Sequence, residues 1–333
     1  MTGQVSKPKI YINYIDYFRA AGLVVEVVPT STNINEDFSD ILTYNPSHTK
    51  SFTPIVPNDS GKWNLKFKFL LGEGTGESAK LVQSINFGAF LNHNAGTLDY
   101  QYITITSLDE GGGGYSLGAS GTGTLSNGFR LLSLDDSLWD DTNCFGLQFK
   151  LSLNNFTIPF RLGSVIAGRS FSFPHSANLS MNINYDTGIK KSKSIGGFDI
   201  VDVNYYRQPD WDGNPPFVST NASGLSSTSH VGRRSWDLTF SFLKSDNVHP
   251  QNMGDGFMFE QTSNLSFLWN NYDTENLISH FMTLTMNGQI PFMFQPDDQV
   301  DTFAMCRLRS NSFSVTQSAP NLYTAKMSFD ETW

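Results

Sequence analysis

Short runs in which apolar and polar residues alternate recur along the whole chain, and they constrain its fold more than any other feature. In Trp63–Leu71, the apolar residues Trp63, Leu65, Phe67 and Phe69 alternate with asparagine and lysine. Because successive side chains of a strand point to opposite faces, this run has one apolar and one polar face. The pattern predicts half-buried antiparallel strands joined by turns.

The same alternation predicts five further strands, and helical patterns are few. The further strands are Tyr100–Leu108, Phe145–Leu153, Leu179–Tyr185, Ser235–Leu243 and Tyr323–Trp333. Helical spacing occurs in Asn13–Gly22 and in Ser263–Gly288, where the apolar stripe lies in Thr274–Met282. We therefore predict an all-β protein with two β-sandwich or jelly-roll-like domains and few short helices.

The length of 333 residues favours two domains, because a single core stops growing before this size. We predict a boundary at about residue 170, which leaves residues 1–60 unassigned and gives domains at 61–170 and 171–333. Two segments are rich in Gly, Ser or Pro and are predicted to be long exposed loops. These loops are Glu110–Gly128 and Tyr206–Gly232.

The charge balance argues against a nucleic-acid partner. The chain carries 22 basic and 31 acidic residues, for a formal charge of −9, whereas binding to phosphate backbones needs clustered Lys and Arg. The basic clusters are short, and we expect them in solvated loops. They are Lys190, Lys191 and Lys193, followed by Arg233 and Arg234.

Two cysteines, Cys144 and Cys306, are too few and too far apart for a disulfide framework. We expect both to be inert core thiols in a protein made in a reducing cytoplasm. The start of the chain, Met1–Phe18, lacks the pattern of a secretory signal, and no apolar run is long enough to span a bilayer. No membrane span is therefore expected.

No motif predicts a catalytic, cofactor-binding or metal site. Gly72–Ser78 lacks the Gly-Lys-Ser/Thr end of a phosphate loop and is expected to be a hairpin turn. The Ser-rich tracts are expected to be turns and not to hold an activated hydroxyl beside a base. The six histidines show no metal-ligand spacing; they are His48, His93, His175, His230, His249 and His280. We predict that the protein is not an enzyme.

Two groups of loop residues have alternative interpretations. An acidic cluster is expected to be a solvated loop, with a calcium site as the alternative; its members are Asp135, Asp136, Asp140 and Asp141. Trp139, Trp211 and Tyr205 could stack on sugar rings or anchor a protein interface, or they could pack at strand ends.

Two stretches of the first domain resemble the discoidin-like, galactose-binding-type jelly rolls of phage tail proteins. They are Leu81–Gly96, which contains Asn92-His93-Asn94, and Phe156–Pro174, with a Gly-x-x-x-x-Gly turn at Gly163–Gly168. The resemblance implies a jelly roll in which His93 is a turn residue.

The second domain resembles phage tail and baseplate components related to distal tail proteins. The matching motifs are the Arg-Arg-x-Trp strand in Gly232–Leu243, Pro-Phe-x-Phe-Gln in Gly288–Asp298, and a last strand that ends in Glu-x-Trp at Glu331–Trp333. This resemblance implies a ring-forming distal tail or adaptor subunit of a virion tail.

The resemblances set the functional expectations. The partners would be copies of the same chain in a ring, for which a hexamer is one candidate, and neighbouring tail or baseplate proteins. The end at Glu331–Trp333 would then be in contact with a neighbour. The alternative is a carbohydrate-binding module that attaches the particle to a host surface glycan. A third reading, a polysaccharide-degrading enzyme, needs two carboxylates across a cleft, and the sequence nominates no such pair.

Overall fold

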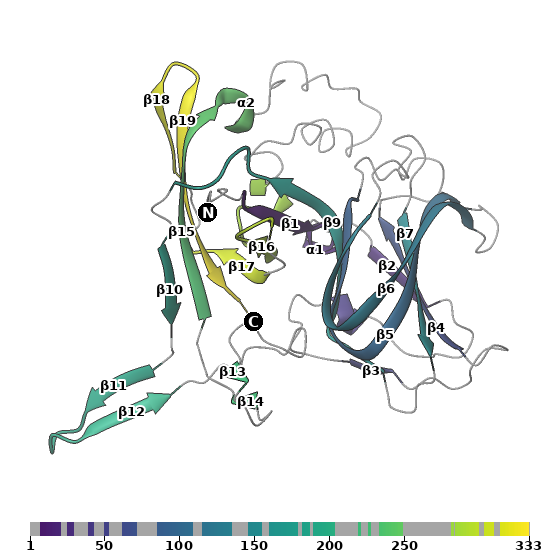
Figure 1. The fold of residues 1–333 in the computed structure, drawn as a ribbon, viewed down its shortest axis with the longest axis horizontal. Coiled ribbons are helices and arrows are strands. Elements are labelled where there is room, and N and C mark those ends of the chain that lie inside the picture. Colours follow the sequence, from purple (N-terminus) through teal and green to yellow (C-terminus); the bar gives the residue numbers. More distant parts are fainter. Residues whose placement is uncertain are drawn as a thin grey trace.

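The computed structural model shows mostly strands with few short helices in the described residues, which confirms the predicted all-β class (Figure 1). The arrangement as two sandwiches stays a prediction. No helix in the described ranges is long and apolar enough to cross a membrane. The structure describes residues 7–20, 25–29, 39–42, 50–52, 62–71, 85–108, 115–134, 146–154, 160–178, 182–186, 189–203, 219–220, 226–227, 233–248, 281–282, 284–299, 303–309 and 314–332.

The elements follow one another as a succession of strands with a few short helices. The first half contains β1 (Lys9–Asn13), α1 (Tyr14–Ala20), β2 (Val25–Pro29), the 3-10 helix η1 (Ser39–Leu42), β3 (Lys50–Phe52), β4 (Lys62–Leu71), β5 (Phe87–Leu108), β6 (Tyr115–Ser133), β7 (Gly146–Asn154), β8 (Phe160–Leu162) and β9 (Ser164–Ser172). The second half contains β10 (Asn182–Asp186), β11 (Ile189–Lys193), β12 (Asp199–Val203), β13 (Ser219–Thr220), β14 (Ser226–Ser227), β15 (Arg233–Lys244), α2 (Ser245–Val248), β16 (Phe292–Gln295), β17 (Ala304–Leu308), β18 (Ser314–Ala319) and β19 (Leu322–Glu331).

These bounds confirm the predicted strands wherever they are described. The alternating runs correspond to β4, the second half of β5, β7, β10, β15 and β19, and the first helical pattern corresponds to α1. Of the second helical pattern only the end is described. There, the amide of Thr285 donates to the carbonyl of Phe281 (3.0 Å), which closes one helical turn.

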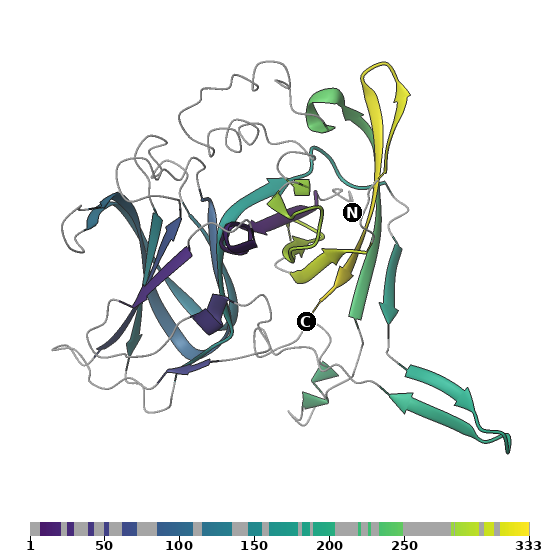
Figure 2. The same cartoon turned by 180° about the vertical axis from the view of Figure 1, so that it is seen from behind.

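Thirteen strands form one sheet whose pairs are all antiparallel. The order is β10-β15-β19-β17-β16-β1-β9-β5-β7-β4-β2, with β18 added on β19 and β6 on β5. Strands β2, β4 to β7 and β9 curl into a first lobe, and β10 and β15 to β19 form a second lobe (Figures 1 and 2). The predicted boundary near residue 170 falls inside β9, which pairs with β1 and β5. The division at 60 and 170 therefore stays a prediction.

Strand β1 connects the two lobes, although the sequence left residues 1–60 unassigned. It pairs with β16 on one edge and with β9 on the other. Ile10 and Ile12 are buried in the larger hydrophobic cluster, whereas Tyr11 is buried in a smaller cluster with Phe87 and Met293. Because Asn13 is buried as well, β1 is covered on both of its faces.

The core of the second lobe is an aromatic cluster beside β1. Trp236 and Phe294 lie edge to face with ring centroids 5.4 Å apart, and Phe329 contacts both Phe292 and Phe294 at 5.1 and 5.0 Å. Such edge-to-face pairs add to the energy of burial. The buried aromatic residues come from β15, β16 and β19, so the cluster fixes the packing of these three strands.

Gly168 allows β1 to approach β9 closely. A Cβ atom at this position would stand 1.9 Å from the carbonyl oxygen of Ile12. The neighbouring Asn13 adds a side-chain link, because its Oδ1 accepts from the amides of Ile15 (3.2 Å) and Ala167 (3.3 Å). Asn13 thus connects the start of α1 to β9.

Two turns implied by the jelly-roll resemblance are wrong. Gly168 lies within strand β9, so Gly163–Gly168 is not a turn. His93 is a buried residue of β5 and pairs with Gly128, with register shifts on both sides. Asn92 beside it has a φ of 57°. The Asn-His-Asn segment is a bulged stretch of a long strand, because β5 continues its pairing with β6 on both sides of it.

The predicted Gly- and Ser-rich loop at Glu110–Gly128 is wrong from residue 115 onward. Residues 115–128 belong to β6, which pairs with β5 over almost its full length. Backbone pairing needs no particular side chain, and the partner β5 is rich in aromatic and β-branched residues, so its tertiary context outweighs the weak strand propensity of glycine. Most of the second predicted loop, Tyr206–Gly232, lies outside the described residues.

Replacing Gly168 tests the contact between β1 and β9. Gly168→Ala is expected to lower the free energy of unfolding by about 3 kcal/mol, because the added carbon collides with backbone that has no room to move. Gly196→Ala is the control, since its added carbon would meet the Phe198 ring at 3.6 Å and Ser194 Oγ at 3.9 Å, both ordinary contacts. Urea denaturation measures both changes, and equal stability of the two variants would contradict this account.

Asp16 makes the stability of this region pH-dependent. Burial raises the pKa of its carboxyl from 3.8 to about 6, against the lowering effects of a hydrogen bond from Asn13 and of the charges of Arg19 and Arg307. The folded chain therefore holds a proton that the unfolded chain releases between these values. Stability from this group falls as pH rises from about 4 to about 6 and then levels off, by on the order of 3 kcal/mol.

Asp16→Asn is expected to remove this dependence. The variant should be more stable than the parent at pH 7 and show a smaller change in unfolding free energy between pH 4 and 6, because its amide carries no buried charge. The Asn13 Nδ2 donor, 2.8 Å from Asp16 Oδ2, keeps an oxygen acceptor in the variant. Denaturation curves at several pH values measure the difference, and parallel pH profiles of the two proteins would contradict it.

Candidate assembly interface

The loop residues selected from the sequence lie outside the described residues. These are Trp139, Trp211, Tyr205, Asp135, Asp136, Asp140, Asp141, Cys144 and the segment Gly72–Ser78. Of the six histidines, His93 and His175 are described and lie in different parts of the chain. Across the described ranges, no three His, Cys, Asp or Glu side chains come together as a metal site requires. The sugar-binding and calcium alternatives therefore stay predictions.

The expectation that Arg233 and Arg234 lie in a solvated loop is wrong. Both belong to β15, and Arg234 is buried opposite Glu331 of β19. Arg234 Nε donates to Glu331 Oε2 (3.0 Å) and Arg234 Nη2 donates to Oε1 (2.7 Å). The Arg234 amide also donates to Oε2 at 2.9 Å, and the guanidinium lies 5.1 Å from the centre of the Trp236 ring. A buried bidentate ion pair thus joins the Arg-Arg-x-Trp motif to the last strand.

The end of the chain is anchored within the protein itself as far as it is described. The Thr332 amide donates to the carbonyl of Met305 (2.8 Å). Cys306 is buried beside this ion pair, as expected for a core thiol, and burial raises the pKa of its thiol well above the ordinary value. A thiol of this kind stays protonated and unreactive. Glu331 therefore acts inside the fold, and its predicted contact with a neighbouring copy stays untested.

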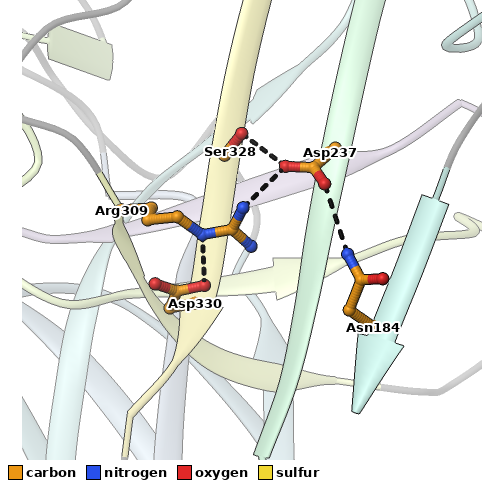
Figure 3. A network of polar contacts seen from close by, with 5 residues as sticks. All are labelled: Asn184, Asp237, Arg309, Ser328 and Asp330. Atoms are coloured by element: carbon orange, nitrogen blue, oxygen red, sulfur yellow. Dashed lines mark hydrogen bonds and ion pairs between the residues drawn. The ribbon is translucent and has the colours of Figure 1, made fainter. Parts of the chain in front are cut away.

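The outer face of the second lobe carries a network of polar side chains (Figure 3). Arg309 donates through Nε to Asp330 (2.9 Å) and through Nη1 to Asp237 (2.9 Å). Asp237 also accepts from Ser328 (2.6 Å) and Asn184 (3.3 Å). The hydrogen bond to Asp330 raises the pKa of the Arg309 guanidinium. These groups are substantially exposed, so each pair contributes about 1 kcal/mol or less to stability. The network links neighbouring strands and contains no activated nucleophile or base.

The hairpin β11–β12 projects from the second lobe (Figures 1 and 2). Its strands pair from Ile189↔Val203 to Lys193↔Asp199. The connecting loop is closed by the Ser194 amide, which donates to the carbonyl of Phe198 (2.9 Å), and by the Gly197 amide, which donates to Ser194 (2.9 Å). Gly197 has a φ of 82°, which suits glycine. The hairpin is therefore a defined structure and not a loose loop.

Apolar side chains of this hairpin face solvent. Ile195 and Phe198 at the tip are 110% and 78% exposed, and Ile200 and Val201 on β12 are 53% and 52% exposed. Isolated two-stranded hairpins are marginally stable in water, and exposed apolar clusters mark interaction sites. The arrangement suits the docking of another protein surface.

The lysines of the hairpin are exposed, as expected, but they lie on a strand and not in a loop. Lys190, Lys191 and Lys193 belong to β11. The sequence signal for a hairpin was present, because Ser-Ile-Gly-Gly separates two short runs that contain Ile and Val. The site could not be predicted from this pattern, because it does not tell whether the two runs are covered by the rest of the fold.

No protein-family model matches the chain, and no curated protein matches it either. The function is therefore proposed from the geometry of the hairpin and from the sequence resemblances.

The ion pair between Arg234 and Glu331 gives a testable energetic prediction. Glu331→Leu is expected to lower the free energy of unfolding by about 3–5 kcal/mol, because it leaves the buried guanidinium without a counter-charge. Adding Arg234→Leu should recover most of this loss, since both buried charges are then absent. Thermal or urea denaturation of the two single variants and the double variant measures the coupling. Additive losses would contradict a buried ion pair.

Proposed function

We propose that this protein is a non-enzymatic structural subunit that assembles with copies of itself in the tail or baseplate of a virus particle. The observation that carries the proposal is the projecting β11–β12 hairpin, with Ile195, Phe198, Ile200 and Val201 in solvent. Full burial of one such side chain contributes about 1.5–3 kcal/mol. Four of them provide enough driving force for a stable contact.

The charge distribution favours a second copy of this chain as the partner. Strand β11 presents three lysines, whereas the whole chain has a formal charge of −9. A basic strand is attracted to an acidic protein surface, and each further copy of the chain provides one. This contact pairs a projecting arm with a different surface of the neighbour. Such heterologous contacts close into a ring when the rotation between copies permits it.

The assignment to a virion tail rests on the sequence resemblance of the second domain to distal tail proteins. The described geometry is compatible with this proposal, because the Arg-Arg-x-Trp and Glu-x-Trp motifs meet in one buried ion pair beside the base of the hairpin. A ring-forming distal tail or adaptor subunit, made in the host cytoplasm and located in the virion tail, is the role that we propose. A hexamer is the ring size to test first.

The carbohydrate-binding alternative depends on Trp139, Trp211 and Tyr205, which lie outside the described residues. No geometric observation favours it over assembly. It predicts retention of the protein on a host-surface glycan and loss of retention when both tryptophans are replaced by alanine. A glycan array with the parent and the double variant separates this function from self-assembly.

The hairpin can be tested by a single substitution at its tip. Phe198→Ser is expected to weaken self-association by about 10- to 100-fold, because it removes one apolar anchor of about 1.5–3 kcal/mol. Ser192→Ala is the matched control, since Ser192 is an exposed residue on the same hairpin and should leave association unchanged. Sedimentation velocity over a range of protein concentrations measures the change.

Two results of this experiment would count against the proposal. If the parent protein is monomeric at every concentration and in mixtures with other particle proteins, it does not assemble. If the parent associates and Phe198→Ser associates equally well, assembly does not use the hairpin tip. Because Phe198 is exposed, loss of folding does not complicate either result.

A further inference from the structure

Exposed large hydrophobic side chains occur at only two places in the part of the chain that the structure describes. Four lie on the β11–β12 hairpin, and the fifth is Phe242, which is 77% exposed. Two separate apolar features on one chain raise the question of whether they cover each other between copies.

Phe242 lies in a β-bulge near the end of β15. The pairing of β15 with β19 shifts between Phe240 and Leu243, which brings two residues, Ser241 and Phe242, opposite one residue of β19. Phe242 has a φ of 63°, in the left-handed region that bulky side chains rarely adopt. Because the ring is exposed in the monomer, burial of the ring does not offset the energetic cost of this backbone conformation. Backbone strain of this kind is concentrated at functional sites.

The β11–β12 hairpin cannot reach Phe242 of its own chain. The hairpin follows β10, whose last residue Asp186 pairs with Arg233 at the start of β15. Phe242 is nine positions further along β15, about 30 Å away at the rise of an extended strand. The hairpin leaves the lobe at the end opposite to α2, which directly follows β15, and points away from it (Figures 1 and 2). Contact between the two features must therefore occur between two molecules.

The residues beside the two aromatic rings have complementary charges. Phe198 is followed by the exposed Asp199, which pairs with Lys193 across the hairpin, and Phe242 is followed by the exposed Lys244 and Asp246, so both surfaces carry charges of both signs. A contact that brings the two rings together would place these opposite charges near its rim. Rim charges of this kind align partners and speed their association.

We propose that Phe242 is the receiving site for the β11–β12 hairpin of a second copy of this chain. The contact is heterologous, because the tip of one copy meets a different surface of the next, so it can propagate around a ring. This inference rests on the proposed self-assembly and adds the identity of the receiving surface. It also gives a reason for the strained bulge, which turns the Phe242 ring out of the sheet.

Two variants that each lose one half of the contact provide the test. Phe198→Ser removes the hairpin anchor, and Phe242→Asn removes the receiving ring. Asparagine tolerates a positive φ better than phenylalanine does, so Phe242→Asn should fold at least as stably as the parent. Each variant alone is expected to associate about 10- to 100-fold more weakly than the parent. Phe242→Tyr keeps the ring and is the matched control that should associate normally.

An equimolar mixture of the two defective variants is the decisive sample. It should form 1:1 heterodimers and nothing larger, because one intact hairpin can still meet one intact Phe242. Native mass spectrometry distinguishes the two chains by mass. Normal association of Phe242→Asn would overturn this inference while leaving the proposed function intact if Phe198→Ser dissociates. A mixture that stays monomeric would also overturn it, because the intact hairpin of one variant would then not bind the intact Phe242 of the other. A monomeric parent protein would overturn the proposed function itself.

Discussion

The fold depends on the two-sided pairing of β1, because among the described strands it is the one that connects the two lobes through the sheet. One edge is bonded to β9 and the other to β16. The approach to β9 is possible because Gly168 has no side chain to meet the Ile12 carbonyl. Asn13 fixes the same junction from the side by bonding the start of α1 and β9 at once. The packing of α1 against this junction also buries the Asp16 carboxyl, and this burial raises its pKa.

The second lobe is stiffened on both faces of the strands that carry the hairpin. The core side holds the aromatic cluster and the buried pair of Arg234 and Glu331. The outer side holds the exposed network around Asp237 and Arg309. Asp186, the last residue of β10, pairs with Arg233, the neighbour of the buried arginine. The apolar tip therefore projects from strands that are held in place by interactions within the monomer. Binding of a partner to the tip does not have to supply the energy that orders these strands.

The sequence predicted the strands well and the long-range arrangement poorly. Alternation located β4, β7, β15 and β19 because one face of each predicted strand is apolar and the other polar, and that signal is local. It did not place β1, because this run of five residues leads directly into the first helical pattern. It misread β6, whose glycines form a strand only because β5 pairs with them. The functional site was missed because the run Asp199–Val203 mixes Ile and Val with aspartates, and only the three-dimensional structure shows that Ile200 and Val201 lie in solvent.

The central claim is that the hairpin is covered by another molecule in the assembled protein. Hydrogen–deuterium exchange of residues 189–203, compared between dilute and concentrated samples, tests this most directly. A hairpin that nothing covers opens readily, so its amides should exchange fast in the dilute monomer. The account predicts strong slowing of exchange in this segment as the protein associates. Equally fast exchange of the hairpin in the monomer and in the assembled protein would contradict it.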